Sequence, residues 1–268
     1  MKGIHVATAL LVVAPVMLTA QGPLRVADLK VSEPTRIVEL DMDKLKGQPF
    51  RLAWSPDGSQ FYVQTLEGSF ADAAAGRSNA KVRHYLFNAA AVGSKKDVQG
   101  PPDWFAEYWN SKNGQHAPGA PALAIDWKKE QRKQTATSAP MGGELAKGGV
   151  GGTTGTSAGD VGAAAYNMQA VPVITLSYKG ETIGEFVNTV MVPGLTYGWG
   201  PTGTNVLAFA AVNSGKVVIV DEQGGKLTID GSKEAVLPAW SQDGTKLAWL
   251  QKDGRKKFQL YVATVSRP

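Results

Sequence analysis

The chain has 268 residues, of which 43% are hydrophobic, and it contains 31 glycines and 15 prolines. This length supports one sizeable core or two small ones, and the glycine and proline content favours many turns over long helices. Because the chain has no cysteine, disulfide bonds, thiolate chemistry, an Fe–S site and a lipid-modified N-terminal cysteine are all excluded.

Residues 1–20 predict a secretory signal peptide. Lys2 precedes an apolar run over 7–17, and Ala20 provides a small residue for cleavage before Gln21. The run is short for a transmembrane helix, and an uncleaved N-terminal anchor is the alternative. Removing Lys2 from the 28 basic residues leaves 27 against 23 acidic ones, a mild excess that does not by itself indicate nucleic acid or membrane. We therefore expect a periplasmic or secreted protein.

A strand–turn–strand unit centred on tryptophan recurs at residues 52–63, 197–208 and 238–249. In each copy a short apolar stretch ends in Trp, and a glycine follows four residues later. Proline or aspartate in between suits a tight turn, glycine supplies positive φ, and an alternating apolar strand comes next. Three copies in register predict repeated hairpins, in which Trp, Asp and Gly have structural roles.

The spacing of the copies predicts propeller blades. Trp199 and Trp240 lie 41 residues apart, the length of one four-stranded blade. Strands at 217–221 and 226–230 fill the interval, and 258–263 provides a third strand for the last blade. The chain ends one strand short there, so we expect residues 36–40 to pair with the C-terminal strand and hide both edges.

The segments W-S-P-D-G-S at 54–59 and W-S-Q-D-G-T-K-L-A-W at 240–249 resemble the TolB-like (WD-repeat-like) β-propeller family. The resemblance covers about 50–65 and 195–265, and the middle copy departs from it at Gly200 and Thr202. It implies a propeller that serves as a binding platform, a periplasmic scaffold or a gating domain. A shared fold of this kind specifies architecture more strongly than activity.

Residues 66–190 show the repeat only faintly. Alternating segments predict strands at 81–87, 122–127, 171–178 and 182–187. Together with the repeats, these strands predict an all-β fold, a small propeller of about four blades in a single domain over 21–268. A glycine-rich stretch at 141–165 cannot bury enough apolar surface to form a core, so we expect a flexible loop inserted in a blade.

Between Pro102 and Gly114, a short helix is predicted. At spacings of one and four it places four aromatic side chains on one face: Trp104, Phe105, Tyr108 and Trp109. One interpretation is a platform that binds a partner or ligand such as a sugar or peptide. The other is a helix whose aromatic residues cover a propeller opening or pack on a sheet.

The chain contains matches to catalytic motifs that lack the surrounding sequence these motifs require. Residues 155–159 match G-x-S-x-G, but glycine-rich sequence precedes them and the three histidines all lie upstream. The same stretch does not end in the Gly-Lys-Ser/Thr sequence of a P-loop. Two histidines follow the predicted signal peptide, and without cysteine they do not favour a zinc or copper site. Basic runs at 128–133 and 252–257 fit solvated hairpins, with contact to anionic lipids or glycans as the alternative.

The sequence thus predicts an exported binding or scaffold protein of the periplasm or cell envelope, without catalysis and without a cofactor or metal. An envelope or extracellular protein is the expected partner, and no nucleic acid is expected. A small-ligand or carbohydrate binder that uses the aromatic residues at 104–109 is the alternative, and an enzyme is a third class.

Overall fold

The structure is a computed structural model that describes residues 23–68, 80–90, 95–133, 168–187, 197–211 and 214–267. The predicted signal peptide and the glycine-rich stretch at 141–165 lie outside these residues. Within the described ranges, the helices are all too short or too polar to cross a membrane.

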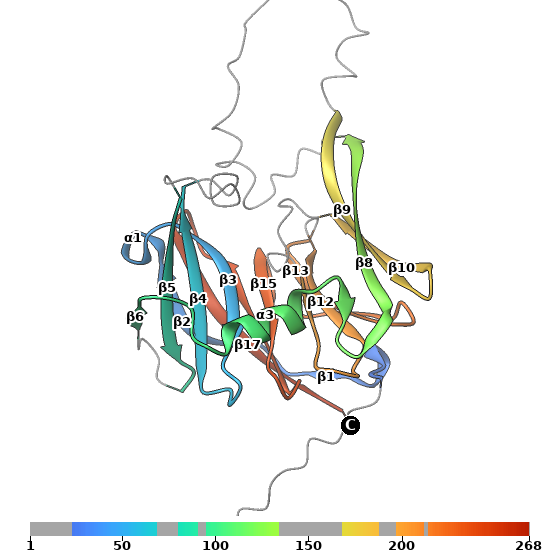
Figure 1. The fold of residues 1–268 in the computed structure, drawn as a ribbon, viewed down its shortest axis with the longest axis horizontal. Coiled ribbons are helices and arrows are strands. Elements are labelled where there is room, and N and C mark those ends of the chain that lie inside the picture. Colours follow the sequence, from blue (N-terminus) through green and yellow to red (C-terminus); the bar gives the residue numbers. More distant parts are fainter. Residues whose placement is uncertain are drawn as a thin grey trace, which may run out of the picture.

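The described residues form four antiparallel sheets, which match the grouping of the predicted strands (Figure 1). Sheet I consists of β3 (Gln48–Trp54), β4 (Gln60–Glu67), β5 (Lys81–Asn88) and β6 (Lys96–Val98). Sheet II consists of β7 (His116–Ala117), β8 (Ala120–Lys133), β9 (Met168–Tyr178) and β10 (Glu181–Val187). Sheet III consists of β11 (Tyr197–Trp199), β12 (Val206–Ala211), β13 (Lys216–Asp221) and β14 (Lys226–Thr228).

Sheet IV combines the two ends of the described chain. It consists of β15 (Ala235–Trp240), β16 (Lys246–Lys252) and β17 (Lys257–Ser266), joined by β2 (Thr35–Asp41) and β1 (Lys30–Val31). Strand β2 pairs antiparallel with β17, and Leu40 lies opposite Phe258. The predicted pairing of residues 36–40 with the C-terminal strand is therefore confirmed. Each sheet has the meander order of a propeller blade.

Three short helices complete the described structure: η1 (Val26–Asp28), α1 (Met42–Leu45) and α3 (Phe105–Asn113). The last of these confirms the predicted helix, although it begins one residue after Trp104, which is the N-cap.

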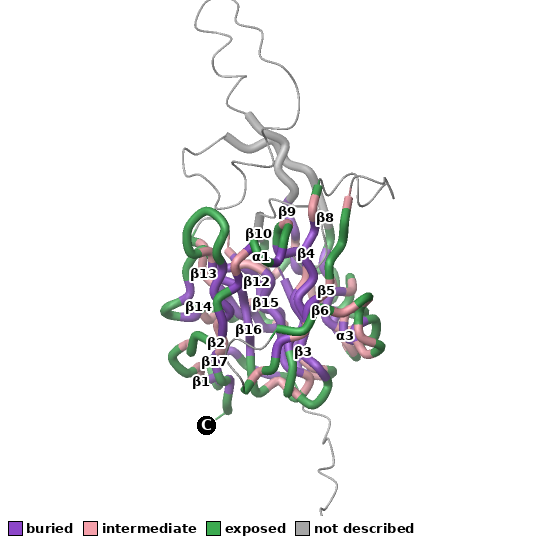
Figure 2. The backbone as a smooth tube through the Cα atoms, turned by 90° about the vertical axis from the view of Figure 1, so that its left-hand side faces the viewer, coloured by how far each residue is buried: buried purple, intermediate pink, exposed green. Residues whose placement is uncertain are grey.

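Sheet IV is buried on both faces, because its strands alternate between two cores. On β16, Ala248 and Leu250 face a core shared with sheet I, whereas Leu247 and Trp249 face a core shared with sheet III. A strand with period-two side chains that is covered on both sides reads as a continuous apolar run, as β16 does. Figure 2 shows the buried residues along the strands and the exposed ones in the connecting loops.

The sheets pack in the order I, IV, III, II, with a third core between sheets III and II. The first and second repeated tryptophans each donate an indole N–H to a neighbouring element, Trp54 to the Ala239 carbonyl at 3.0 Å and Trp199 to the Gly114 carbonyl at 2.8 Å. Trp240 is fully buried as well. The structural role predicted for the tryptophans is confirmed.

Inner strands of sheets III and IV approach so closely that the repeat changes at Gly198. A Cβ atom there would lie 2.7 Å from the Pro238 carbonyl oxygen. The other two copies carry alanine at this position, Ala53 and Ala239. Glycine in the middle copy is therefore a packing requirement and not a loss of pattern.

Candidate functional site

Aspartates of the repeated turns hold their own hairpins. The Ser241 hydroxyl donates to Asp243 at 2.6 Å, and the backbone N–H and hydroxyl of Thr245 donate to the same carboxylate. Asp57 is held in the same way by Ser55 and Ser59. These bonds lower the pKa of Asp57 to about 2. The turn role predicted for both aspartates is confirmed.

Two of the four aromatic residues predicted as a site are buried in the core. Phe105 is 5% exposed and Tyr108 is 1% exposed, and both belong to the cluster between sheets I and IV. The Tyr108 hydroxyl donates to the Trp240 carbonyl at 2.8 Å, which fixes α3 against sheet IV. These two side chains position the helix.

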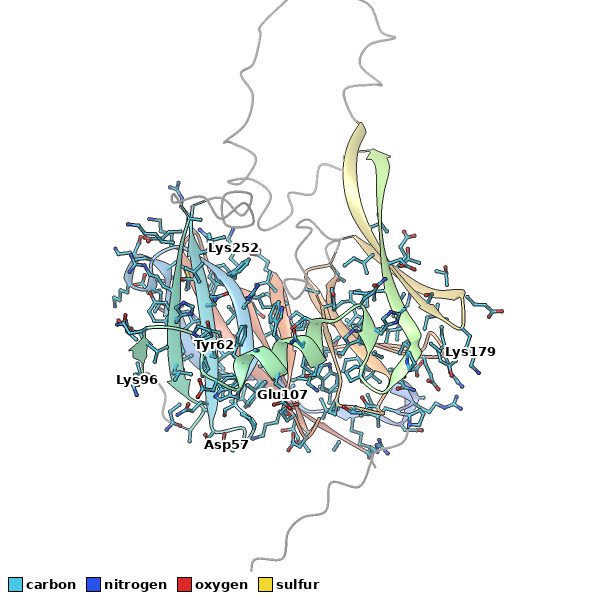
Figure 3. The ribbon with its side chains drawn as sticks, in the orientation of Figure 1. Asp57, Tyr62, Lys96, Glu107, Lys179 and Lys252 are labelled. Carbon is cyan, nitrogen blue, oxygen red and sulfur yellow. The ribbon has the colours of Figure 1, made fainter. Side chains whose placement is uncertain are left out.

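The other two, Trp104 and Trp109, are partly exposed at the edge of the same core. Trp104 meets the Tyr62 ring edge-on, with 6.3 Å between the ring centroids. The ring centroid of Phe105 lies 4.6 Å from that of Tyr62. Figure 3 shows Tyr62 on β4 beside the start of α3. The helix thus brings Trp104 and Phe105 to the face of sheet I that carries Tyr62.

Arg51 completes this face with a positive charge. Its guanidinium carbon lies 4.5 Å from the ring centroid of Trp109, 4.9 Å from that of Phe50 and 5.8 Å from that of Phe105. Cation–π contacts of this kind strengthen as the cation is desolvated. Within the described residues, Arg51 forms no salt bridge, and its Nε is buried without a hydrogen-bond partner.

A chain of polar groups runs next to the guanidinium. Gln64 lies directly opposite Arg51 across β3 and β4, and its Nε2 donates to the Tyr62 hydroxyl at 3.1 Å. That hydroxyl lies 2.6 Å from Nδ1 of His84. Gln64 is 5% exposed, and its Oε1 has no partner within the described residues. Among those residues, a buried donor and a buried acceptor are thus unpaired on neighbouring strands, which is costly unless something else binds them.

Burial sets the charge states of the cluster. It lowers the pKa of His84, which favours the neutral ring, and Nδ1 of a neutral imidazole can accept the Tyr62 proton. Burial also raises the pKa of Tyr62 to about 12, although the nearby Arg51 opposes the shift. Burial lowers the pKa of Arg51. A guanidinium is not deprotonated in proteins, so the side chain remains a cation. We call these residues, together with Trp104 and Trp109, the Arg51 cluster.

The Arg51 cluster combines a cation with aromatic neighbours, and it includes an amide oxygen that has no partner in the described residues. No group of three or more His, Asp or Glu side chains gathers in the described ranges in a way that could hold a metal. His116, the other described histidine, lies elsewhere, with Nδ1 3.0 Å from the Pro121 carbonyl.

Lys112 is a second unusual group, on the core side of α3. It is 2% exposed, and burial lowers its pKa to about 7, partly opposed by the charge of Asp243. Its amine is enclosed by the helix and the turn of sheet IV. We assign it to the packing of α3 rather than to a binding surface.

A polar hollow of about 400 Å³ opens on sheet IV near the β16–β17 hairpin. Its lining mixes both charge signs, and Gln259 donates to Glu39 and Asp253 at 3.0 and 2.9 Å. Asp253 thus has a partner, whereas Oε1 of Gln259 is buried without one in the described residues. Among the described residues that line the hollow, no aromatic side chain is stacked on a cation, which distinguishes it from the Arg51 cluster.

Sequence reasoning found Trp104 and Trp109 but missed Arg51, Gln64 and His84. One signal for Arg51 was available: the third copy of the repeat carries Leu237 at the equivalent position, where it is 1% exposed. A charged residue at a buried apolar position of a repeat indicates a special environment.

No protein-family model and no curated protein sequence matches the chain. Among solved structures, it is similar to TolB from Acinetobacter baumannii, with 11% identity and a TM-score of 0.28 over 83% of this chain and 44% of that chain. It is also similar to an oligogalacturonate lyase in complex with manganese, with 9% identity and a TM-score of 0.24 over 81% of this chain and 65% of that one. The chain thus spans less than half of the TolB structure and under two thirds of the lyase. Neither likeness assigns a family.

Proposed function

We propose that this chain is an exported, propeller-type binding domain of the cell envelope that recognises a protein partner and carries out no catalysis. The observation that supports binding is the Arg51 cluster: a half-buried cation without an ion pair in the described residues, beside partly exposed indoles. Arginine and tryptophan are enriched where binding energy concentrates in protein interfaces. Residues 1–20 support export.

Titratable groups near the repeated turns and the cluster take part in hydrogen bonds within the protein. Asp57 and Asp243 are held in turns, and His84 is joined to Tyr62. Binding without turnover is therefore the simplest function for the cluster.

Photo-crosslinking in the native host tests this proposal. A photoreactive aromatic amino acid replaces Trp109, and a matched variant carries it at Lys179, an exposed turn residue of sheet II. We expect a discrete protein adduct from position 109 that the variant at position 179 does not give. The same adducts from both positions, or none from position 109, would contradict a partner-binding role for this surface.

Binding of a small ligand or carbohydrate is a second candidate, favoured by the two partly exposed indoles of Trp104 and Trp109. A glycan array with the wild-type chain and with Trp104→Ala and Trp109→Ala separates the two functions. Glycan binding that both substitutions remove would support the second candidate.

A further inference from the structure

We infer that the Arg51 cluster binds the C-terminal carboxylate of a peptide segment of the partner. This inference rests on the binding function proposed above and names the chemical group that the site recognises. It is carried by three observations on the described residues: a cation without an ion pair there, its position over the Trp109 ring, and the amide oxygen of Gln64 on the opposite strand, which has no partner there.

The charge of Arg51 is the first observation. Removing a cation from water is costly, and most half-buried guanidinium groups are matched by a carboxylate. Arg51 is already surrounded by Phe50, Phe105 and Trp109 in the free protein, within the part of the chain that the structure describes. An incoming carboxylate therefore gains an attraction for which part of the desolvation of the arginine has already taken place in the free protein. A single positive charge matches a carboxylate better than a phosphate, which carries close to two negative charges at neutral pH.

The orientation of the guanidinium is the second observation. The planar group lies over the Trp109 ring, and the strand position of Arg51 opposite Gln64 fixes where the side chain begins. A planar fork held in one place binds a carboxylate through two parallel hydrogen bonds. The Nε of Arg51 is buried without a hydrogen-bond partner in the described residues, so the guanidinium still has donor capacity to offer.

Gln64 provides the third observation and favours a chain terminus over an acidic side chain. Its Nε2 donates to Tyr62, whereas Oε1 is an acceptor for which the described part of the chain supplies no donor. The last residue of a peptide carries a backbone N–H beside its carboxylate, so it can serve both Gln64 and Arg51. An Asp or Glu side chain brings only acceptors and would leave Oε1 unpaired.

A sugar acid fits the cluster less well. Sugars stack on the open face of an indole ring, but Arg51 covers one face of Trp109 and Trp104 meets Tyr62 edge-on. The partly exposed aromatic edges instead suit an apolar side chain next to the carboxylate. We therefore expect apolar C-terminal residues to bind best.

The test uses the full chain and immobilised tetrapeptides that cover all twenty C-terminal residues, each made as a free acid and as a carboxamide. A third set carries an internal Asp or Glu and an amidated end, and glucuronate oligomers serve as competitors. We expect a subset of free acids to bind and to weaken at least tenfold as carboxamides, with apolar last residues preferred. Arg51→Gln should weaken the same peptides at least tenfold.

Arg83→Gln is the matched control, because Arg83 lies on the same sheet, points to the opposite face and is already paired with Glu67 at 2.9 Å. It should change peptide binding less than twofold. Gln64→Glu is a second variant that does not remove the arginine: it places a carboxylate opposite Arg51 and should abolish binding by occupying the guanidinium.

Equal binding of acids and carboxamides would overturn the inference, as would binding confined to internal acidic residues or to glucuronate. Unchanged binding in folded Arg51→Gln or Gln64→Glu would also overturn it. If no peptide binds while position 109 still gives a specific crosslink in the host, the carboxylate inference fails and the proposed binding function stands. If the crosslink is absent as well, both fail.

Discussion

At the scale of single residues, the hairpin turn of the repeat has the same serine–aspartate hydrogen bonds in the first and third copies and lacks them in the middle copy. The Ser241 hydroxyl donates to Asp243 and accepts the Lys246 N–H, so one serine links both strands of its hairpin. Ser55 and Asp57 repeat this arrangement. In the middle copy Gly200 replaces the serine, since a Cβ there would lie 2.6 Å from both Thr204 and Val206.

We predict that Asp243→Ala lowers the free energy of unfolding by about 1–3 kcal/mol, because it leaves several donors without their acceptor. Thr202→Ala, at the equivalent and exposed position of the middle copy, should stay within about 0.5 kcal/mol. Urea unfolding of the two variants measures both values. Equal effects would mean that the hydrogen bonds of Asp243 do not stabilise the hairpin.

The depressed pKa values of Asp57 and Asp243 also predict acid sensitivity. Their unfolded-state pKa lies near 4, so their contribution to stability is complete above that pH. It is lost as the pH falls from about 4 toward the folded-state value, near 2 for Asp57.

Lys112 predicts a rise of stability with pH. Its folded-state pKa of about 7 lies below the unfolded value of 10.5, so between these two the unfolded chain binds more protons. Stability should therefore increase from pH 7 to pH 9, by at most about 1.4 kcal/mol per pH unit. Three buried tyrosines have raised pKa values: Tyr62, Tyr108 and Tyr197. They affect stability only above about pH 10, where the unfolded chain loses these protons first and the folded state becomes less stable.

Lys112→Met should remove most of this rise and stabilise the protein at pH 7, where the wild-type chain buries a partly charged amine. Denaturant titrations at pH 7, 8 and 9 measure the slope. A slope as steep in the variant as in the wild type would show that Lys112 is not its source.

At the scale of elements, the pairing of β2 with β17 was predictable because an unpaired edge at the chain end required a strand, and residues 36–40 alternate correctly. The existence of α3 was also predictable from aromatic spacing and from Pro102 and Gly114. Its position was not, because the contact that fixes it joins Tyr108 to Trp240, 132 residues apart. A local pattern contains no information on such a partner.

We predict that Leu40→Ala lowers the free energy of unfolding by about 2–5 kcal/mol, because the side chain is 1% exposed and lies opposite Phe258 on β17. Thr35→Ala, at the exposed start of the same strand, should change it by less than about 0.5 kcal/mol. Thermal or urea unfolding provides the comparison. A near-neutral Leu40→Ala would mean that the N-terminal strand is not integral to sheet IV.

At the scale of the whole molecule, four sheets share three cores, and α3 lies across inner strands of neighbouring sheets through its contacts with β3, β11 and Trp240. The helix has two sides with different tasks. Phe105, Tyr108 and Lys112 pack inward, while Trp104 and Trp109 reach the partly exposed face of sheet I.

The candidate site could be predicted only in part. The aromatic residues of the helix formed a visible pattern, but Arg51, Gln64 and His84 come from three strands that meet through pairing of β3, β4 and β5. No spacing along the chain marks them as neighbours. Their chemistry became visible only when the register placed Gln64 opposite Arg51.

The central claim is that sheet I carries a cation without a counter-charge among the described residues, and Gln64→Glu tests it directly. The substitution supplies the missing carboxylate opposite Arg51, and we predict a gain of about 1–2 kcal/mol at pH 7, which raises the melting temperature by roughly 2–8 °C. The introduced carboxylate should have a lowered pKa, so the gain should fade as the pH drops below about 4, and it should disappear in the Arg51→Gln background. A melting temperature that falls on Gln64→Glu, to the same extent with and without Arg51, would contradict the claim.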